Sequence, residues 1–188
     1  MFISAFQLVK GDIFTAISSG NVKKVEKELQ SNPNELNKIG SGGQSPLMNA
    51  VLSGKTEVVR FLLQEGADVT IGEQDGYTPM HGAGFQGRAE IAQLLLDHGL
   101  SGTDFHNDGF APFHRACWGT EQRHTDTVEV FLKSGIPIGL KSKNSKSCRS
   151  MTKNTATIAL IKKYKEQSKK STDSSSSSSS SRDQHDSL

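Results

Sequence analysis

The feature that most constrains this chain is an internal repeat with a period of 33 residues. Three similar segments, each with a proline at its second position, begin at Ser45, Thr78 and Ala111. When the units are aligned without a gap, Gly54 falls on Gly87, and many other equivalent positions carry the same residue type. A period of this length indicates stacked units, because one unit is too small to bury its own apolar face.

One unit has the start and stop signals of two helices. Thr78 is a suitable N-cap, and Pro79 suits the first helical position because it has no N–H to leave unpaired there. Gly87 then predicts the end of a short first helix, and a second helix is expected over 90–97 with its end at Gly99. The turn-rich stretch that follows predicts a hairpin-like finger reaching towards the next unit.

The segment Thr78-Pro79-Met80-His81 resembles the start of an ankyrin repeat. The resemblance implies an all-α, ankyrin-like helix-turn-helix solenoid with short hairpin fingers and about four to five repeats, including degenerate caps. It also implies that His81 and His114 are structural groups that bond between adjacent fingers. Ala83 and Gly84 are small, so a neighbouring helix should approach closely there.

The expected divisions of the chain follow the repeat. They are an N-terminal capping segment at 1–10, a degenerate first repeat at 11–42, repeats at 43–75 and 76–108, a repeat with an insertion at 109–144, a degenerate C-terminal cap at 145–167 and a disordered Ser-rich tail at 168–188. The tail includes eight consecutive serines and has almost nothing to bury. The insertion at 120–126 is expected as a loop before a helix at 127–133, either functional or a harmless extension.

Composition and cysteine usage narrow the setting. No apolar run approaches the roughly 18 residues that a membrane span needs, and the N-terminus lacks a signal-peptide pattern. Two cysteines, Cys117 and Cys148, predict no disulfide framework, and a reduced intracellular setting is the default. We therefore expect a cytoplasmic or nuclear monomer without a cofactor.

Charge is uneven along the chain. Residues 1–138 carry 11 Lys and Arg against 16 Asp and Glu, whereas residues 139–170 carry 10 against 1. The basic region, with Lys162, Lys163 and Lys165, leaves open a nuclear-import signal or binding to nucleic acid or another anionic surface. A solvated helix face explains the same lysines, and no aromatic residues alternate with them as in many nucleic-acid sites.

A metal-dependent enzyme is a further alternative. His114 and Cys117 are spaced to share one helix face, and His124 is close in sequence. Four ligands at zinc spacing are absent, however, and the acidic residues Glu57 and Glu90 recur once per repeat, as structural positions do. We therefore expect no catalytic residue and no metal ligand.

Binding to a protein partner is the expected function, as an adaptor, scaffold or regulatory subunit. The resemblance implies that the fingertips and the exposed sides of the first helices line a continuous concave face. The candidate binding residues on that face are Leu52, Tyr77, Phe85, Phe110 and Trp118, with Glu73, Asp75 and Asp108 as an acidic rim. Exposed aromatic clusters are typical of interfaces. The alternative is that these rings pack beneath the neighbouring finger and support the stack.

Overall fold

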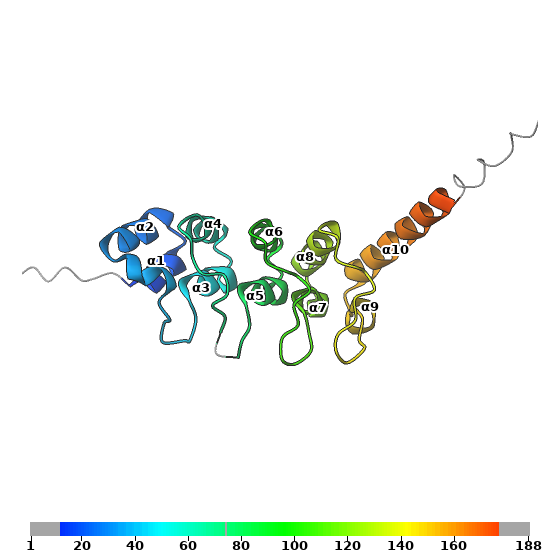
Figure 1. Ribbon diagram of the computed structural model, residues 1–188, viewed down its shortest axis with the longest axis horizontal. Helices are drawn as coiled ribbons and strands as arrows, with labels where there is room; N and C mark the ends of the chain where they lie inside the picture. Colours follow the sequence, from blue (N-terminus) through cyan, green and yellow to red (C-terminus); the bar gives the residue numbers. More distant parts are fainter. Residues whose placement is uncertain (1–11, 74, 177–188) are drawn as a thin grey trace, which may run out of the picture.

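The chain folds into two parallel rows of helices joined by loops (Figure 1). The computed structural model describes residues 12–73 and 75–176, and within these no β-strand forms. The first row contains α1 (Ile13–Ser19), α3 (Pro46–Leu52), α5 (Pro79–Gln86), α7 (Pro112–Trp118) and α9 (Cys148–Met151). The second row contains α2 (Val22–Ser31), α4 (Thr56–Gln64), α6 (Ala89–Asp97), α8 (Gln122–Lys133) and α10 (Thr155–Ser176), and a 3-10 turn, η1 (Pro33–Asn37), follows α2. The expected all-α solenoid is confirmed.

Helices α3, α5 and α7 begin where the repeat predicts. The side chains of Ser45 and Thr78 accept hydrogen bonds from the backbone N–H groups of Met48 and His81, and a proline follows each cap. Such caps pair donors that the first helical turn would otherwise leave unsatisfied. At the equivalent position Ala111 has no side-chain oxygen, so the start of α7 lacks this cap.

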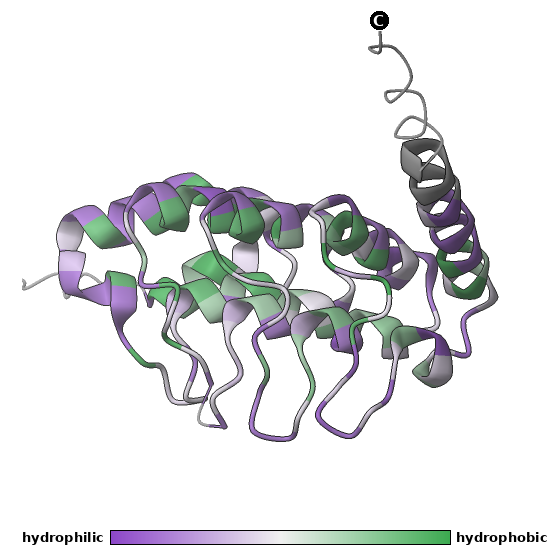
Figure 2. Ribbon diagram, turned by 45° about the vertical axis from the view of Figure 1, so that its right-hand side comes forward, coloured by the Kyte–Doolittle hydropathy of each residue, from purple (hydrophilic) through white to green (hydrophobic). Residues whose placement is uncertain are grey.

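The fingers are short loops closed by one recurring backbone hydrogen bond. The N–H group of one residue donates to the carbonyl four residues later in three successive fingers, at Gly40 to Gln44, Glu73 to Tyr77 and His106 to Phe110, over 2.8–3.0 Å. In the next finger the equivalent bond runs from Ser142 to Lys146, three residues later than the period requires. Figure 2 shows that the fingertips are mostly hydrophilic, whereas apolar residues concentrate in the helices.

Small residues bring the first helices close together, as the sequence predicts. Ala83 is fully buried in α5, and a Cβ atom on Gly84 would collide with the backbone carbonyl of Pro112 in α7. Gly54 and Gly87 have φ values of +68° and +66°, a region that residues with a side chain rarely adopt. These glycines therefore set the turn between the two helices of a repeat.

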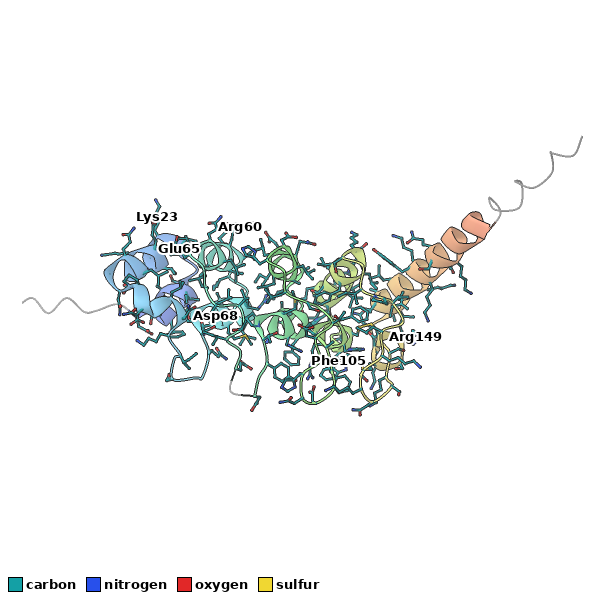
Figure 3. The ribbon with its side chains drawn as sticks, in the orientation of Figure 1. Lys23, Arg60, Glu65, Asp68, Phe105 and Arg149 are labelled. Carbon is teal, nitrogen blue, oxygen red and sulfur yellow. A yellow bond between two sulfur atoms is a disulfide. The ribbon has the colours of Figure 1, made fainter. Side chains whose placement is uncertain are left out.

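The outer side of the second row is polar, and its inner side supplies the core. Figure 3 shows Lys23 and Arg60 pointing away from the stack. Val25, Leu62 and Leu95 are each fully buried against the first row. Among the described helices, none is both long and apolar enough to cross a membrane.

The insertion in the fourth repeat is helical, so the predicted loop is wrong. Helix α8 begins at Gln122 rather than at residue 127. Its first turn reaches the end of α5, where Arg123 Nη1 donates to the Gln86 carbonyl over 2.6 Å and His124 Nε2 donates to the Phe85 carbonyl over 3.2 Å. The extra residues thus satisfy carbonyls that the end of a helix leaves free.

The prediction of two unpaired, reduced cysteines is also wrong. Cys117 in the last turn of α7 and Cys148 at the start of α9 form a disulfide bond, with their Cα atoms 5.4 Å apart. Both side chains are fully buried. The reason is geometric, because neighbouring first helices pack side by side and place the two Cβ atoms within bonding reach.

The C-terminal helix is longer than the sequence predicts. Thr157 and Ile161 of α10 are buried against the stack, and Thr157 shares a 2.7 Å hydrogen bond with Thr125 of α8. Because no proline or glycine interrupts it, α10 continues through Ser176 and projects away from the stack (Figure 1). The disordered tail was therefore predicted to start too early. Residues 177–188 and the predicted N-terminal capping segment lie outside the described residues, and the repeat boundaries stay predictions.

Candidate functional site

The predicted binding residues lie at two kinds of position. Leu52, Phe85 and Trp118 stand at or near the C-terminal ends of α3, α5 and α7, and Tyr77 and Phe110 stand where a finger leads into the next first helix. Phe85 and Trp118 are 53% and 37% exposed, whereas the other three are partly buried. The alternative that these rings pack inside the stack is therefore ruled out for Phe85.

Three of the four predicted rings surround a buried arginine that the sequence reasoning missed. Arg115 of α7 is only 4% exposed, and its Cζ atom lies 4.3 Å from the ring centre of Trp118, 4.7 Å from that of Tyr77 and 5.4 Å from that of Phe110. A guanidinium over aromatic faces is held by the ring quadrupoles. These rings therefore stabilise an internal cation as well as forming surface.

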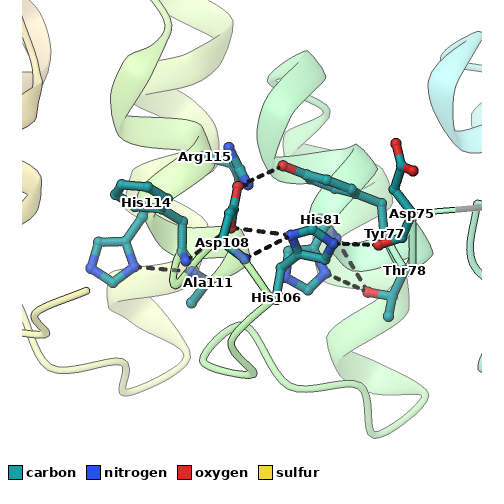
Figure 4. Close-up of polar contacts among 10 residues, drawn as sticks. Asp75, Tyr77, Thr78, His81, His106, Asp108, Ala111, His114 and Arg115 are labelled. Carbon is teal, nitrogen blue, oxygen red and sulfur yellow. Dashed lines mark hydrogen bonds and ion pairs between the residues drawn. The ribbon is translucent and has the colours of Figure 1, made fainter. Parts of the chain in front are cut away.

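Asp108 neutralises this arginine and joins two fingers (Figure 4). Its carboxylate forms an ion pair with Arg115 and accepts a 3.1 Å hydrogen bond from the Tyr77 hydroxyl, and His106 Nδ1 lies 3.1 Å from it. Burial alone would raise the pKa of Asp108, but hydrogen bonds from Arg115 and His106 outweigh it and lower the pKa to about 2. Asp108 is thus charged at neutral pH, and it is part of the stack as well as of the predicted rim.

His81 and His114, which stand one period apart on first helices, play structural roles. His114 Nε2 donates to the Leu140 carbonyl in the following finger over 3.2 Å, as the family resemblance implies. His81 differs, because its Nδ1 atom bonds to Thr78 Oγ1 over 2.8 Å and its Nε2 atom has no partner among the described residues. Burial lowers the pKa of His81 to about 4, and the nearby charges of His106 and Arg115 act in the same direction.

A hollow of about 190 Å³ lies next to this cluster, between the second and third repeats. Its lining combines apolar groups with two carboxylates and consists of Met48, Leu52, Glu73, Asp75, Tyr77, Gly82 and Phe85. Five of these seven were predicted as binding residues, so the structure brings more than half of the predicted set around one hollow. Met48 and Gly82 were not predicted.

Other exposed features stand apart from this hollow. Ile39 and Phe105 are 51% and 39% exposed on fingers, and neither was predicted. A groove of about 390 Å³ between Arg149 (Figure 3) and the first half of α10 is lined by basic residues such as Lys162 and Lys165 over an apolar base that includes Ile161. The predicted basic region therefore has a surface depression of its own.

The three residues considered as metal ligands are engaged elsewhere. Cys117 is in the disulfide, and His114 and His124 bond to backbone carbonyls. Within residues 12–73 and 75–176, no group of three His, Cys, Asp or Glu side chains is arranged to hold a metal ion.

Comparison with known proteins agrees with the repeat geometry. A family model for ankyrin repeats (3 copies) matches residues 13–105 and 71–142. The chain is 34% identical over 65 residues to a Notch-regulated ankyrin repeat-containing protein of Xenopus tropicalis, a match that covers 33% of this chain and 57% of that protein. It is also 36% identical over 58 residues to zebrafish ankyrin repeat and SAM domain-containing protein 6, which covers 31% of this chain and 8% of that protein.

A viral relative has the higher identity. An ankyrin repeat protein of fowlpox virus is 44% identical over 57 residues, covering 30% of this chain and 13% of the viral protein. The matches span only part of each relative, so they concern the repeats and not those proteins as wholes. Because the family model covers more than half of the chain and the helices recur with its period, the chain belongs to the ankyrin repeat family.

Proposed function

We propose that this chain is a non-enzymatic protein-protein interaction module, acting as an adaptor, scaffold or regulatory subunit. The single observation that carries the proposal is the exposure of Phe85 and Trp118 at equivalent points of neighbouring repeats, together with the hollow that Phe85 helps to line. Large exposed aromatic residues around a depression are typical of interface hot spots. Ankyrin repeats are generally protein-binding modules, which supports the same assignment.

Rigid support is the second argument for this surface. Trp118 packs edge-on against Phe110 at 4.9 Å between ring centres, and both rings rest on Arg115. A side chain that is already held in place loses little conformational entropy when a partner binds, so this entropy cost offsets less of the energy of the contact. The Arg115 cluster would thus hold Trp118 ready for a partner.

Affinity capture from cell extract tests the proposal. Phe85→Ala removes the most exposed ring, and loss of a partner that the parent chain captures is expected. Ile39→Ala is the matched control, because Ile39 is equally exposed but lies on the first finger, away from the hollow. Equal capture by the parent chain and Phe85→Ala would contradict the assignment of binding to this surface.

Binding of nucleic acid or another anionic surface is the second candidate. The groove that Arg149, Lys162 and Lys165 line favours it. Contacts to phosphates weaken steeply as salt rises, so the decisive measurement is RNA and heparin binding in about 150 mM salt. Loss of that binding in Lys162→Glu/Lys165→Glu, but not in Lys23→Glu/Lys24→Glu on α2, would support this function.

We also propose that the protein is a monomer located in the cytoplasm or nucleus, and one observation stands against that location. The Cys117–Cys148 disulfide argues against a reducing compartment, since such bonds persist mainly in oxidising ones. Trapping thiols with an alkylating reagent in intact cells decides between a reducing compartment and an oxidising one. Free thiols on both cysteines would favour the cytoplasm or nucleus, and blocked ones would not.

A further inference from the structure

The repeat supplies a template for a binding site one unit away from Arg115. In the fourth repeat, the guanidinium of Arg115 lies against Trp118 and Phe110 and pairs with Asp108. These four residues come from one repeat and its finger. An arginine side chain is therefore a stable occupant of the space between a finger and the end of a first helix in this fold.

The third repeat has equivalents of these four positions, with glycine in place of the arginine, although Gln44 replaces Tyr77, the third ring around Arg115. One period of 33 residues earlier, Phe85 stands at the position equivalent to Trp118, Tyr77 at that of Phe110, Asp75 at that of Asp108 and Gly82 at that of Arg115. All four of these earlier residues line the hollow of about 190 Å³. A single water needs only roughly 10–15 Å³ of such space, so the hollow has room for a group much larger than a water. The hollow is thus the place where a guanidinium group would lie if Gly82 carried an arginine side chain.

The charges around the hollow favour a cation. Its lining includes the carboxylates of Glu73 and Asp75 and no Lys or Arg side chain. Glu73 accepts a 2.7 Å hydrogen bond from Gln44, whereas within the described residues the Asp75 carboxylate has no hydrogen-bond or ion-pair partner. Arg115, the nearest cation of the template, is already paired with Asp108. Asp75 therefore supplies the carboxylate equivalent to Asp108, and that carboxylate is available to pair with a cation.

We propose that this hollow binds an arginine side chain of the partner protein, with its guanidinium against Phe85 and Tyr77 and paired with Asp75. The inference rests on the proposed function, because it assumes a partner on this face. Arginine fits better than lysine, since a planar guanidinium stacks on rings and forms forked hydrogen bonds to a carboxylate, whereas an ammonium group does neither. The chain thus uses one geometry twice, with an internal arginine in one repeat and an external arginine in the other.

The test uses short blocked peptides and the full chain. Acetylated Gly-Arg-Gly amide is titrated into isotope-labelled protein, and shifts are followed at the Gly82 amide and the Phe85 ring. The arginine peptide should give saturable shifts at both positions. The lysine peptide should bind at least roughly tenfold more weakly than the arginine peptide, and the citrulline peptide, which keeps the shape without the charge, should give no shifts. Equal shifts for all three peptides, or none for the arginine peptide, would overturn the proposal.

Two variants sharpen the result. Gly82→Arg should fill the hollow from within and abolish the peptide shifts, and it should fold, because a Cβ there meets only the ends of Met48 and Leu52 at 3.1 and 3.2 Å. Asp75→Asn should weaken the arginine peptide roughly tenfold. Glu65→Gln on the second-helix side (Figure 3) is the control for loss of one negative charge and should change nothing. If Gly82→Arg does not fold, unchanged binding in Asp75→Asn would still refute the site.

The outcome also separates this site from the broader function. Loss of a captured partner in Phe85→Ala together with silent arginine titrations would leave the interaction surface standing and remove the arginine site. Shifts at Gly82 that grow with protein concentration, without any peptide, would identify a second copy of the chain as the occupant. That result would overturn the proposal that the occupant comes from a separate partner protein.

Discussion

Reduction of the Cys117–Cys148 bond should loosen the C-terminal end of the stack and leave its centre intact. The cysteines are 31 residues apart in sequence. For a loop of this size, the chain-entropy relation gives roughly 3.5–4 kcal/mol of stabilisation at 25 °C, because the bond restricts the unfolded chain. At about 2–4 °C per kcal/mol for a chain of this length, reduction should lower the melting temperature by roughly 7–15 °C.

Circular-dichroism melts with and without dithiothreitol measure the effect, and the same sample is analysed by mass spectrometry to count free thiols. Cys117→Ala/Cys148→Ala is the matched variant, and its melt should not respond to the reductant. Hydrogen exchange should locate the change in α8, α9 and α10, since contacts in a solenoid reach only neighbouring repeats. An unchanged melt in a sample with two free thiols would refute the reasoning.

Three other perturbations test the stack. Ala83→Asp places a charge at a fully buried helix contact and should cost several kcal/mol in the free energy of unfolding, so a melt equal to that of the parent would contradict the packing of α5 against α7. Asp108→Asn leaves Arg115 buried beside a neutral group and should cost about 1–3 kcal/mol, less than for a fully buried pair because the Asp108 side chain is 40% exposed, whereas Asp108→Asn/Arg115→Met should recover much of the loss; a double-mutant cycle with no coupling would exclude the ion pair. The pKa of His81 is about 4 in the folded state and about 6.5 when unfolded, so its contribution is complete above pH 6.5 and is lost as the pH falls towards 4, by up to about 1.4 kcal/mol per pH unit. Urea unfolding at pH 7 and pH 4.5 should show this loss, and His81→Asn should reduce it; an equal loss in both chains would assign it to other groups.

The periodic part of the structure could be predicted from the sequence. Thr78, Pro79 and Gly87 mark helix ends by local chemistry, and the repeat transfers each assignment to the next unit. The same logic brought Leu52 and Phe85 together, because residues one period apart occupy equivalent positions in neighbouring repeats. Positions in a regular array follow from the period alone.

The departures from the period could not be predicted in the same way. Arg115 stands where the neighbouring repeats have Asn49 and Gly82, so its burial depends on the single ring cluster around it. The helical insertion at Gln122 depends on carbonyls at the end of α5, which are distant in sequence. The pairing of Cys117 with Cys148 likewise needs the spacing between first helices. The insertion and the disulfide are contacts between different repeats, and the Arg115 cluster includes Tyr77 from the preceding repeat, so a pattern within one repeat does not encode them.

Arg115 also has a consequence for how the chain finds its native alignment. Near-identical units can dock one place out of step, because shape alone barely distinguishes one neighbour from the next. A displaced α7 would keep Phe110, Trp118 and Asp108, which are close to it in sequence, but it would lose the ring and the hydroxyl group of Tyr77, which belong to the preceding repeat, and would meet Gln44 at the equivalent position. We expect the contact of Arg115 and Asp108 with Tyr77 to favour the native junction over frame-shifted stacks during folding.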